Sequence, residues 1–276
     1  MCRTTYGDLI AAVKLSESVY QPERHIRDDI AAWNMQHVGH VENAGTFATI
    51  AIDAHGCMWL VFRGTQLNDW LDINSDRRFL PTIEGDGLVH RGFVGAFEAV
   101  WRGIEQQCVN HVGRIVVTGH SLGGALSSLA ARRLGVARRK LRLSKPDVIT
   151  FGCPLVGSPS WIRSLQWSCG DVIRVTNGGD PVPWLFAWPL YQHPDTARIH
   201  FDGEGRVIWN PSRWSQLRSM PCGKVRGVVR FCQAYWQTRS FFRAWLQVTN
   251  VFDHAVHRYR GQVVSLFEGL ENEAIV

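Results

Sequence analysis

The chain lacks several features that would place it in well-defined classes of protein. No stretch is apolar for the length of a membrane span, and the N-terminus has no basic segment followed by an apolar run of signal-peptide length. The seven cysteines are scattered, odd in number and without Cys-x-x-Cys spacing, which argues against a disulfide framework and a zinc site. No internal repeat, low-complexity tract or linker divides the 276 residues.

These absences set the first expectations. We expect one domain over residues 1–276, with no metal and no cofactor. A cytoplasmic protein or one at the periphery of a membrane is predicted, while export without a leader, or after removal of a leader, stays open. The oligomeric state does not follow from the sequence.

Acidic residues are absent from one long stretch of the chain. Between Gly205 and Phe252 there is no Asp or Glu, whereas eight Lys and Arg residues give this stretch a charge of about +8. Aromatic residues from Trp209 to Trp245 are interleaved with the cations. We name residues 205–252 the basic aromatic segment and expect it to be an insertion within the domain.

The basic aromatic segment raises the question of a partner. Cations for lipid phosphates and aromatics for the headgroup boundary are what a membrane-surface helix requires, so the segment predicts contact with an anionic membrane surface. A core-packing insertion with solvated arginines is the alternative. No nucleic-acid-binding motif is present, and nucleic acid is not expected as a partner. A second basic run, from Arg132 to Lys145, is interpreted as a solvated helix end and loop.

The most informative stretch runs from Val116 to Leu126. It holds an apolar β-branched run, the turn Gly-His-Ser-Leu-Gly at 119–123 and the start of an Ala/Leu-rich helix. This is the strand, nucleophile elbow and helix of an α/β-hydrolase, in which a sharp Gly-x-Ser-x-Gly turn lifts the serine hydroxyl above the sheet edge. Ser121 is therefore the candidate nucleophile. Because the pattern also occurs by chance as a glycine-rich turn, its partners must be found.

The remaining pattern predicts a mostly parallel central sheet flanked by helices. Alternating strands and helices of this length are typical of an α/β fold, here the α/β-hydrolase fold with a lid segment. The expected elements are hairpins at 46–62 and 197–209, strands at 114–118, 147–151 and 171–176, helices at 5–18, 89–108, 121–134 and 161–167, and a short helix or irregular lead-in at 29–35.

A serine hydroxyl needs an imidazole base, and the imidazole needs a carboxylate that holds its tautomer. In α/β-hydrolases the chain order is Ser, then Asp or Glu, then His, so both partners must follow Ser121. Asp180 comes directly after the expected strand at 171–176, in a loop that prolines stiffen, and is the best candidate carboxylate. Asp195, Asp202 and Glu204 lie around the later hairpin, where solvated carboxylates are expected.

Four histidines follow the serine in the chain. His254 lies after all the expected strands, where the chain can return to the elbow, and is the candidate base. His257, one helical turn later, is its competitor. His193 and His200 flank the edge hairpin, where contacts with backbone groups or solvent are expected.

An oxyanion requires N–H donors aimed at the position where its charge develops. The elbow supplies one donor, the amide of Leu122. A second donor is expected from a loop after an early strand, and Thr65, presented by the first hairpin, is placed to give its amide.

Several segments, in order, resemble the motif set of the class 3 lipases. That family contains fungal triacylglycerol lipases, feruloyl esterases, plant phospholipases A1 and diacylglycerol lipases. The segments are Phe62–Thr65, Asn68–Trp70, Val89–Phe93, Gly119–Ala125, Phe151–Gly157, Asp180–Pro183, and Asp253-His254 with Tyr259. The similarity runs from about residue 46 to residue 259.

The resemblance implies a role for each matched position. It implies Ser121 as nucleophile, Asp180 as orienting acid, His254 as general base, and Thr65 and Leu122 as the oxyanion hole. The implied lid consists of Gln66, Leu67, Asn68, Asp69, Trp70, Leu71, Asp72 and Ile73. The family needs no metal for catalysis.

Two positions depart from the family pattern. Leu155 stands where the family commonly has arginine, and Ser158 stands where it commonly has asparagine. A local rearrangement of this loop is therefore expected.

Together, these residues predict a serine carboxylic-ester hydrolase, a lipase that cleaves acyl esters of glycerolipids through an acyl-enzyme. The substrate is thus a lipid or another ester. A phospholipase A1 or a feruloyl-type esterase on the same triad is an alternative, and a non-catalytic lipid-binding protein is the alternative from a different class.

Overall fold

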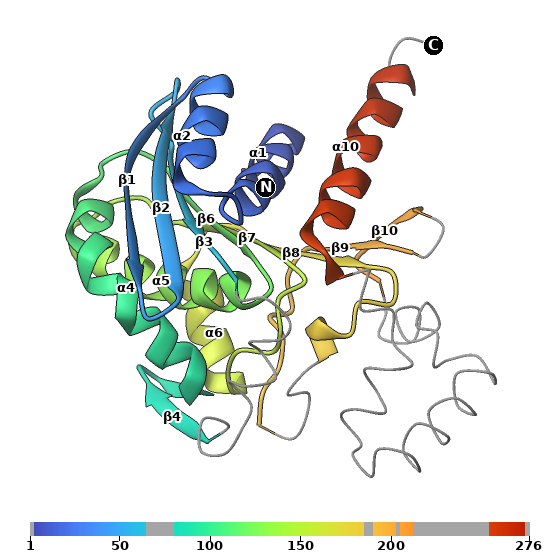
Figure 1. Cartoon of the computed structure of the whole chain (residues 1–276). Coiled ribbons are helices and arrows are strands. Elements are labelled where there is room, and N and C mark those ends of the chain that lie inside the picture. The colour runs from blue at the N-terminus through green and yellow to red at the C-terminus, as the bar shows by residue number, and fades with distance from the viewer. Residues whose placement is uncertain (1–2, 65–79, 185–189, 203–204, 212–253, 274–276) are drawn as a thin grey trace, which may run out of the picture.

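The computed structural model describes residues 3–64, 80–184, 190–202, 205–211 and 254–273 (Figure 1). The expectations for Thr65, for the lid at 66–73 and for nearly all of the basic aromatic segment lie outside these residues. Within the described part, a mixed β-sheet lies between two groups of helices (Figure 1). No helix in that part is long and apolar enough to cross a membrane.

The sheet has the order β1-β2-β3-β6-β7-β8-β9-β10 over the described ranges. The four pairings from β3 to β9 are parallel, and the pairings at both edges are antiparallel. The strand bounds are β1 (Met35–Asn43), β2 (Thr46–Asp53), β3 (Met58–Phe62), β6 (Ile115–His120), β7 (Asp147–Phe151), β8 (Val172–Asn177), β9 (Arg198–Phe201) and β10 (Val207–Trp209). The prediction of a mostly parallel central sheet is therefore confirmed, as are both expected hairpins.

Helices cover both faces of this sheet. One face packs against α4 (Arg91–Asn110), α5 (Leu122–Lys140) and α6 (Pro159–Ser168), and the other against α1 (Tyr6–Ser18) and α10 (Val256–Glu273), with α2 (Glu23–Ala32) beside α1 (Figure 1). A small hairpin, β4 (Pro81–Glu84) and β5 (Gly87–His90), lies outside the main sheet, and a 3₁₀ turn, η1 (Val182–Trp184), follows β8.

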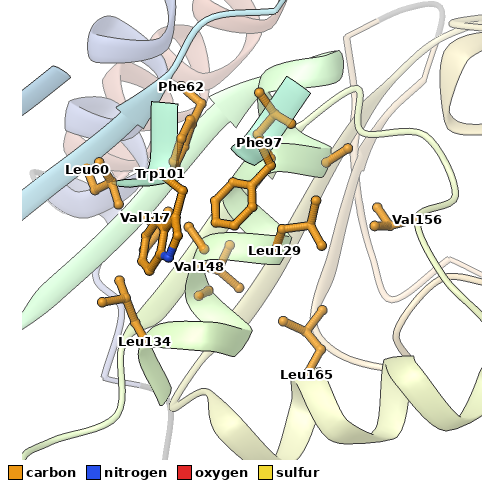
Figure 2. Packing of buried hydrophobic residues seen from close by; sticks show 14 of the residues in the cluster. Leu60, Phe62, Phe97, Trp101, Val117, Leu129, Leu134, Val148, Val156 and Leu165 are labelled. Atoms are coloured by element: carbon orange, nitrogen blue, oxygen red, sulfur yellow. The ribbon is translucent and has the colours of Figure 1, made fainter. Parts of the chain in front are cut away.

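The central strands are buried on both faces because each residue points alternately into one of two hydrophobic clusters. Leu60 and Phe62 of β3 face the helices α4 to α6, whereas Trp59 and Val61 of the same strand face α1 and α2. Figure 2 shows the first cluster, where Phe97 stacks on Trp101 with ring centroids 4.9 Å apart. Continuous apolar runs in the sequence are the expected signature of such doubly covered parallel strands.

Several elements differ from the expectations. The second helix, α2, begins earlier than the short helix or lead-in expected at 29–35 and ends at Ala32, and a strand, β1, begins at Met35. β1 is rich in polar residues because it is an edge strand whose residues are partly or fully exposed. The hairpin β4–β5 and the helix α10 were not predicted, since their patterns are short or interrupted by polar residues.

The interpretation of the run from Arg132 to Lys145 as solvated is wrong for Arg132, Arg133 and Arg138, whereas Arg139 and Lys140 at the end of α5 are exposed as expected. Arg138 is fully buried and donates hydrogen bonds to the backbone carbonyls of His111, Gly113 and Ser144. Arg132 forms ion pairs with the two carboxylates of the β4–β5 hairpin. Arg133 pairs with Glu84 of that hairpin and with a carboxylate of α4. These arginines therefore tie α5 to its neighbours.

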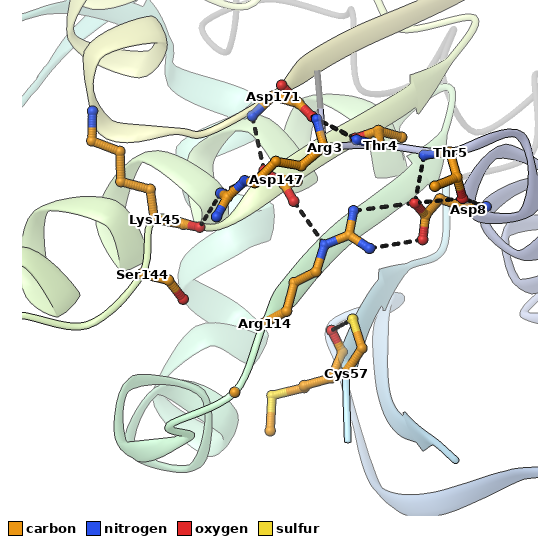
Figure 3. Close-up of polar contacts among 12 residues, drawn as sticks. Arg3, Thr4, Thr5, Asp8, Cys57, Arg114, Ser144, Lys145, Asp147 and Asp171 are labelled. Carbon is orange, nitrogen blue, oxygen red and sulfur yellow. Dashed lines mark hydrogen bonds and ion pairs between the residues drawn. The ribbon is translucent and has the colours of Figure 1, made fainter. Parts of the chain in front are cut away.

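A buried carboxylate organises the opposite end of the sheet from the elbow. Asp147, the first residue of β7, is fully buried and accepts hydrogen bonds from Arg114 Nε at 2.9 Å, Arg3 Nη2 at 3.2 Å and the Asp171 amide at 2.8 Å (Figure 3). Arg114 also donates to both oxygens of Asp8 on α1. This network joins α1 to the starts of three neighbouring strands.

We predict that Asp147→Asn lowers the free energy of unfolding by about 1.5–3 kcal/mol, because hydrogen bonds to a buried charged group are weakened and Arg114 loses one of the two carboxylates with which it is paired. Urea denaturation followed by circular dichroism measures the loss. The matched control is Asp86→Asn. The carboxylate of Asp86 likewise accepts a hydrogen bond from an arginine, and one from a serine, but it is mostly exposed. The control should be much less destabilising, and equal losses would contradict the role of burial.

Candidate active site

The turn at the carboxyl end of β6 holds Ser121 in a strained conformation. Its backbone has φ 59° and ψ −127°, a left-handed conformation that costs a residue with a side chain about 1–3 kcal/mol. The turn is closed by close packing: a Cβ atom on Gly123 would lie 2.3 Å from the Phe62 carbonyl oxygen, and one on Gly119 would lie 2.5 Å from Gly123. Only glycine permits β3, β6 and α5 to approach one another this closely.

Three side chains from distant parts of the chain meet at this turn. His254 Nε2 lies 2.8 Å from Ser121 Oγ, and His254 Nδ1 lies 2.9 and 3.0 Å from the two carboxylate oxygens of Asp180. All three residues are at most 3% exposed. With hydrogen on Nδ1, the imidazole donates to Asp180 and can accept the proton of the serine hydroxyl at Nε2.

The carboxylate of Asp180 is held by two further donors. The Val182 amide donates to Oδ1 at 2.8 Å, and the Tyr259 hydroxyl of α10 donates to Oδ2. Gly152, just after β7, lies beneath this cluster with φ +56°, and a Cβ there would lie 2.8 Å from Asp180 Oδ2 and 3.1 Å from His254 Cε1. Neither Tyr259 nor Gly152 had been assigned a role from the sequence, although both lie in the recognised motifs.

The competing histidines lie elsewhere. His257 is exposed on α10, His200 Nδ1 lies 2.9 Å from Thr176 Oγ1, and His193 Nε2 lies 2.6 Å from the Pro183 carbonyl oxygen. None of them lies within hydrogen-bonding distance of Ser121 in the described structure.

The competing carboxylates also lie elsewhere. Asp202 forms an ion pair with Arg206 in the β9–β10 hairpin, Asp195 is exposed in the loop before β9, and Glu204 lies outside the described residues.

One of the two expected oxyanion donors is described. Leu122 is the first residue of α5, so its amide is among the helix N–H groups that have no intrahelical acceptor. The positive end of the helix dipole lies at the same place. Gly64 ends the described run after β3, and Thr65 follows it outside that run.

The loop after β7 carries the two departures from the family pattern. Leu155 is 7% exposed, and Ser158 precedes α6 and accepts a hydrogen bond from the Leu88 amide at 3.0 Å. Ser158 thus ties this loop to β5. No group of three or more His, Cys, Asp or Glu residues that could hold a metal ion occurs among residues with described positions.

The sheet, the elbow and the Ser121–His254–Asp180 arrangement define an α/β-hydrolase. Residues 59–189 match the family model described as lipase (class 3), and over this part the chain resembles the class 3 lipases.

Two curated relatives are similar to this chain, and one solved structure shares its fold. A secreted mono- and diacylglycerol lipase of Fusarium solani is 35% identical over 125 residues, covering 43% of this chain and 36% of that protein. A lipase of Rhizopus niveus is 31% identical over 227 residues, covering 76% of this chain and 52% of that protein. The solved structure of Rhizomucor miehei triacylglyceride lipase has a TM-score of 0.62 at 23% sequence identity, covering 74% of this chain and 82% of that chain. The chain thus spans about a third to a half of the length of the curated relatives it matches.

We predict that Gly152→Ala lowers ester hydrolysis at least tenfold, because its methyl group would displace Asp180 or His254 by a distance that matters to catalysis. Steady-state kinetics with a soluble ester measures the change. Gly45→Ala is the matched control: Gly45 also has a positive φ of +74°, but a Cβ there meets nothing within 4 Å. Both variants carry backbone strain, so equal losses of activity would show that strain alone is responsible.

We predict an acid destabilisation that His90 helps to cause. Burial lowers the pKa of His90 from 6.5 to about 4, so between these values the unfolded chain binds a proton that the folded chain excludes. Stability should therefore fall as the pH drops from about 6.5 to about 4. His90→Phe keeps a ring against Phe93, whose centroid is 4.5 Å away, and should make the fall shallower in urea titrations at several pH values.

Buried His120 and His200 also have lowered pKa values, so the acid destabilisation should be reduced but not abolished in His90→Phe. The same substitution at the exposed His55 should leave the dependence on pH unchanged. A wild-type slope in His90→Phe would contradict the assignment.

Proposed function

We propose that this chain is a serine carboxylic-ester hydrolase, a lipase that cleaves acyl esters of glycerolipids. The observation that carries the proposal is the buried chain of hydrogen bonds from Ser121 through His254 to Asp180 at the carboxyl end of a parallel sheet. The match of residues 59–189 to the class 3 lipase model supports the same reaction class.

In the first half of the reaction, Ser121 Oγ attacks the ester carbonyl carbon while its proton passes to His254 Nε2. The imidazolium formed is stabilised by the carboxylate of Asp180, which accepts a hydrogen bond from Nδ1. The Nδ1 hydrogen stays on the imidazole throughout. The Leu122 amide, and Thr65 as the expected second donor, bind the oxyanion of the tetrahedral intermediate. The intermediate collapses to an acyl-serine, and the leaving alcohol takes the proton from Nε2.

In the second half, water attacks the acyl carbon and gives a proton to His254 Nε2. The second tetrahedral intermediate releases the carboxylic acid, and Ser121 recovers its proton from Nε2. No metal or cofactor is required at any step, since the imidazole carries each proton and backbone amides stabilise the charge.

The substrate class is proposed from the relatives and from the charge of the chain. Two relatives are named as a lipase and as a mono- and diacylglycerol lipase, which favours acyl esters of glycerol. The charge of about +8 over the basic aromatic segment favours an anionic lipid surface, so a phospholipase A1 activity on the same triad is the second candidate. A peripheral membrane location would follow from such binding.

We predict that Ser121→Ala and His254→Ala each lower kcat for p-nitrophenyl esters by about 10⁴-fold or more, because each removes a group that acts as part of a unit. His257→Ala should retain activity close to wild type, since its side chain is exposed and outside the site. If His257→Ala were inactive and His254→Ala active, the assignment of the base would be wrong. If the wild type bound lipid but hydrolysed no ester, the chain would be a lipid-binding protein.

The same proteins distinguish the candidate substrates. Turnover of triacylglycerol or diacylglycerol emulsions above that of phospholipid vesicles would support the lipase. A rate of cleavage of anionic vesicles that falls steeply with salt concentration would support the phospholipase. Salt screens the attraction between the vesicles and the basic aromatic segment. A preference for soluble aromatic esters, with vesicles untouched, would point to a feruloyl-type esterase.

A further inference from the structure

Tyr20 and His120 lie against the triad without belonging to it. His120 precedes Ser121 in the elbow and is 5% exposed. Its Nδ1 lies 3.1 Å from the Tyr20 hydroxyl, and its Nε2 lies 2.6 Å from the backbone carbonyl oxygen of His254. Its ring also packs against the His254 ring, with centroids 4.5 Å apart.

The chemistry of these groups sets the direction of each hydrogen bond. The carbonyl of His254 can only accept, so the hydrogen of neutral His120 must be on Nε2, and Nδ1 must hold the lone pair. The Tyr20 hydroxyl therefore donates to Nδ1. Burial and the nearby His254 lower the pKa of His120 well below its usual value, and burial raises the pKa of Tyr20. Both groups stay neutral at neutral pH, so these directions are maintained.

Tyr20 also connects this pair to the other side of the site. Its hydroxyl oxygen lies against the backbone of Gly64, and its own hydrogen is used on His120. The contact is tight: a Cβ on Gly64 would lie 2.5 Å from the Tyr20 hydroxyl oxygen and 2.7 Å from the His120 carbonyl oxygen. Gly64 immediately precedes Thr65, the expected oxyanion donor.

We propose that Tyr20 and His120 are positioning residues that fix the general base and the backbone leading to the oxyanion hole through one directional hydrogen-bond relay. Asp180 orients the ring of His254, whereas His120 holds its main chain, so the base is restrained at two points. The inference rests on the proposed function, in which small displacements of a base or an oxyanion donor slow the reaction severely.

The first test is Tyr20→Phe, which removes the hydroxyl and keeps the ring. With a soluble p-nitrophenyl ester we expect kcat to fall about tenfold, the loss that one well-placed hydrogen bond explains, while KM changes less than twofold. Tyr6→Phe is the matched control: it removes a hydroxyl from an exposed tyrosine at the start of α1 and should leave both constants unchanged. Wild-type kcat in Tyr20→Phe would overturn the proposal.

The second test asks whether the two residues act in series. His120→Leu removes the donor to His254, whereas the amide of His120→Gln can replace it, so the glutamine variant should retain more of kcat. Adding Tyr20→Phe to His120→Leu should cause clearly less than the product of the two single losses, because Tyr20 acts on the base through His120 and only its contact with Gly64 is then left to lose. Losses that multiply would show independent roles and overturn the relay.

A spectroscopic measurement separates failure of the relay from failure of the proposed function. The proton on His254 Nδ1, shared with Asp180, should give a downfield nuclear magnetic resonance signal in the wild type and in Tyr6→Phe. In Tyr20→Phe the signal should broaden or shift as His254 loses its restraint. If no ester is hydrolysed by the wild type, the proposed function fails, while this signal still decides the relay: an unchanged signal in Tyr20→Phe overturns it.

Discussion

The close approach of β3, β6 and α5 at the elbow is the constraint on which the site depends. The Phe62 carbonyl lies so near Gly119 and Gly123 that no side chain fits between them. This packing holds Ser121 in a backbone conformation that it would not adopt alone, and it aims the first amides of α5 at the space above the serine. The buried core beneath, including the stacked rings of Phe97 and Trp101, supplies the apolar burial that offsets the strain.

Two buried carboxylates at opposite ends of the parallel strands show how the surroundings of a charge suit its task. Asp147 is paired with guanidinium groups, including that of Arg114, which remain charged and bind α1 to the sheet. Asp180 instead faces an imidazole, a tyrosine hydroxyl and a backbone amide. A permanent cation would suit stability, but a neutral imidazole that can gain and lose a proton suits general-base chemistry. The difference separates the stabilising end of the molecule from the reactive end.

Local sequence patterns predicted the elbow, the central strands and the order of the site residues, because each depends on a short run of neighbours. Buried parallel strands are indicated by the β-branched runs at β6 and β7. Together with the glycines at 119 and 123, these runs are specific for a nucleophile elbow. The edge strand β1 was missed because half of its environment is solvent, so its polar composition resembles that of a loop. Arg138 was misread because its partners are backbone carbonyls, which no residue type in the sequence reveals.

The sequence by itself determined which residues are chemically able to act and the order in which they occur, with Ser121, Asp180 and His254 in the order of an α/β-hydrolase. Only the tertiary structure decided that His254, rather than the exposed His257, lies against the serine. It also revealed the contacts of Tyr20 with His120, 100 residues apart in the chain. The physical reason is that hydrogen bonds depend on atoms a few ångströms apart, and the packing of the sheet and its helices creates that proximity.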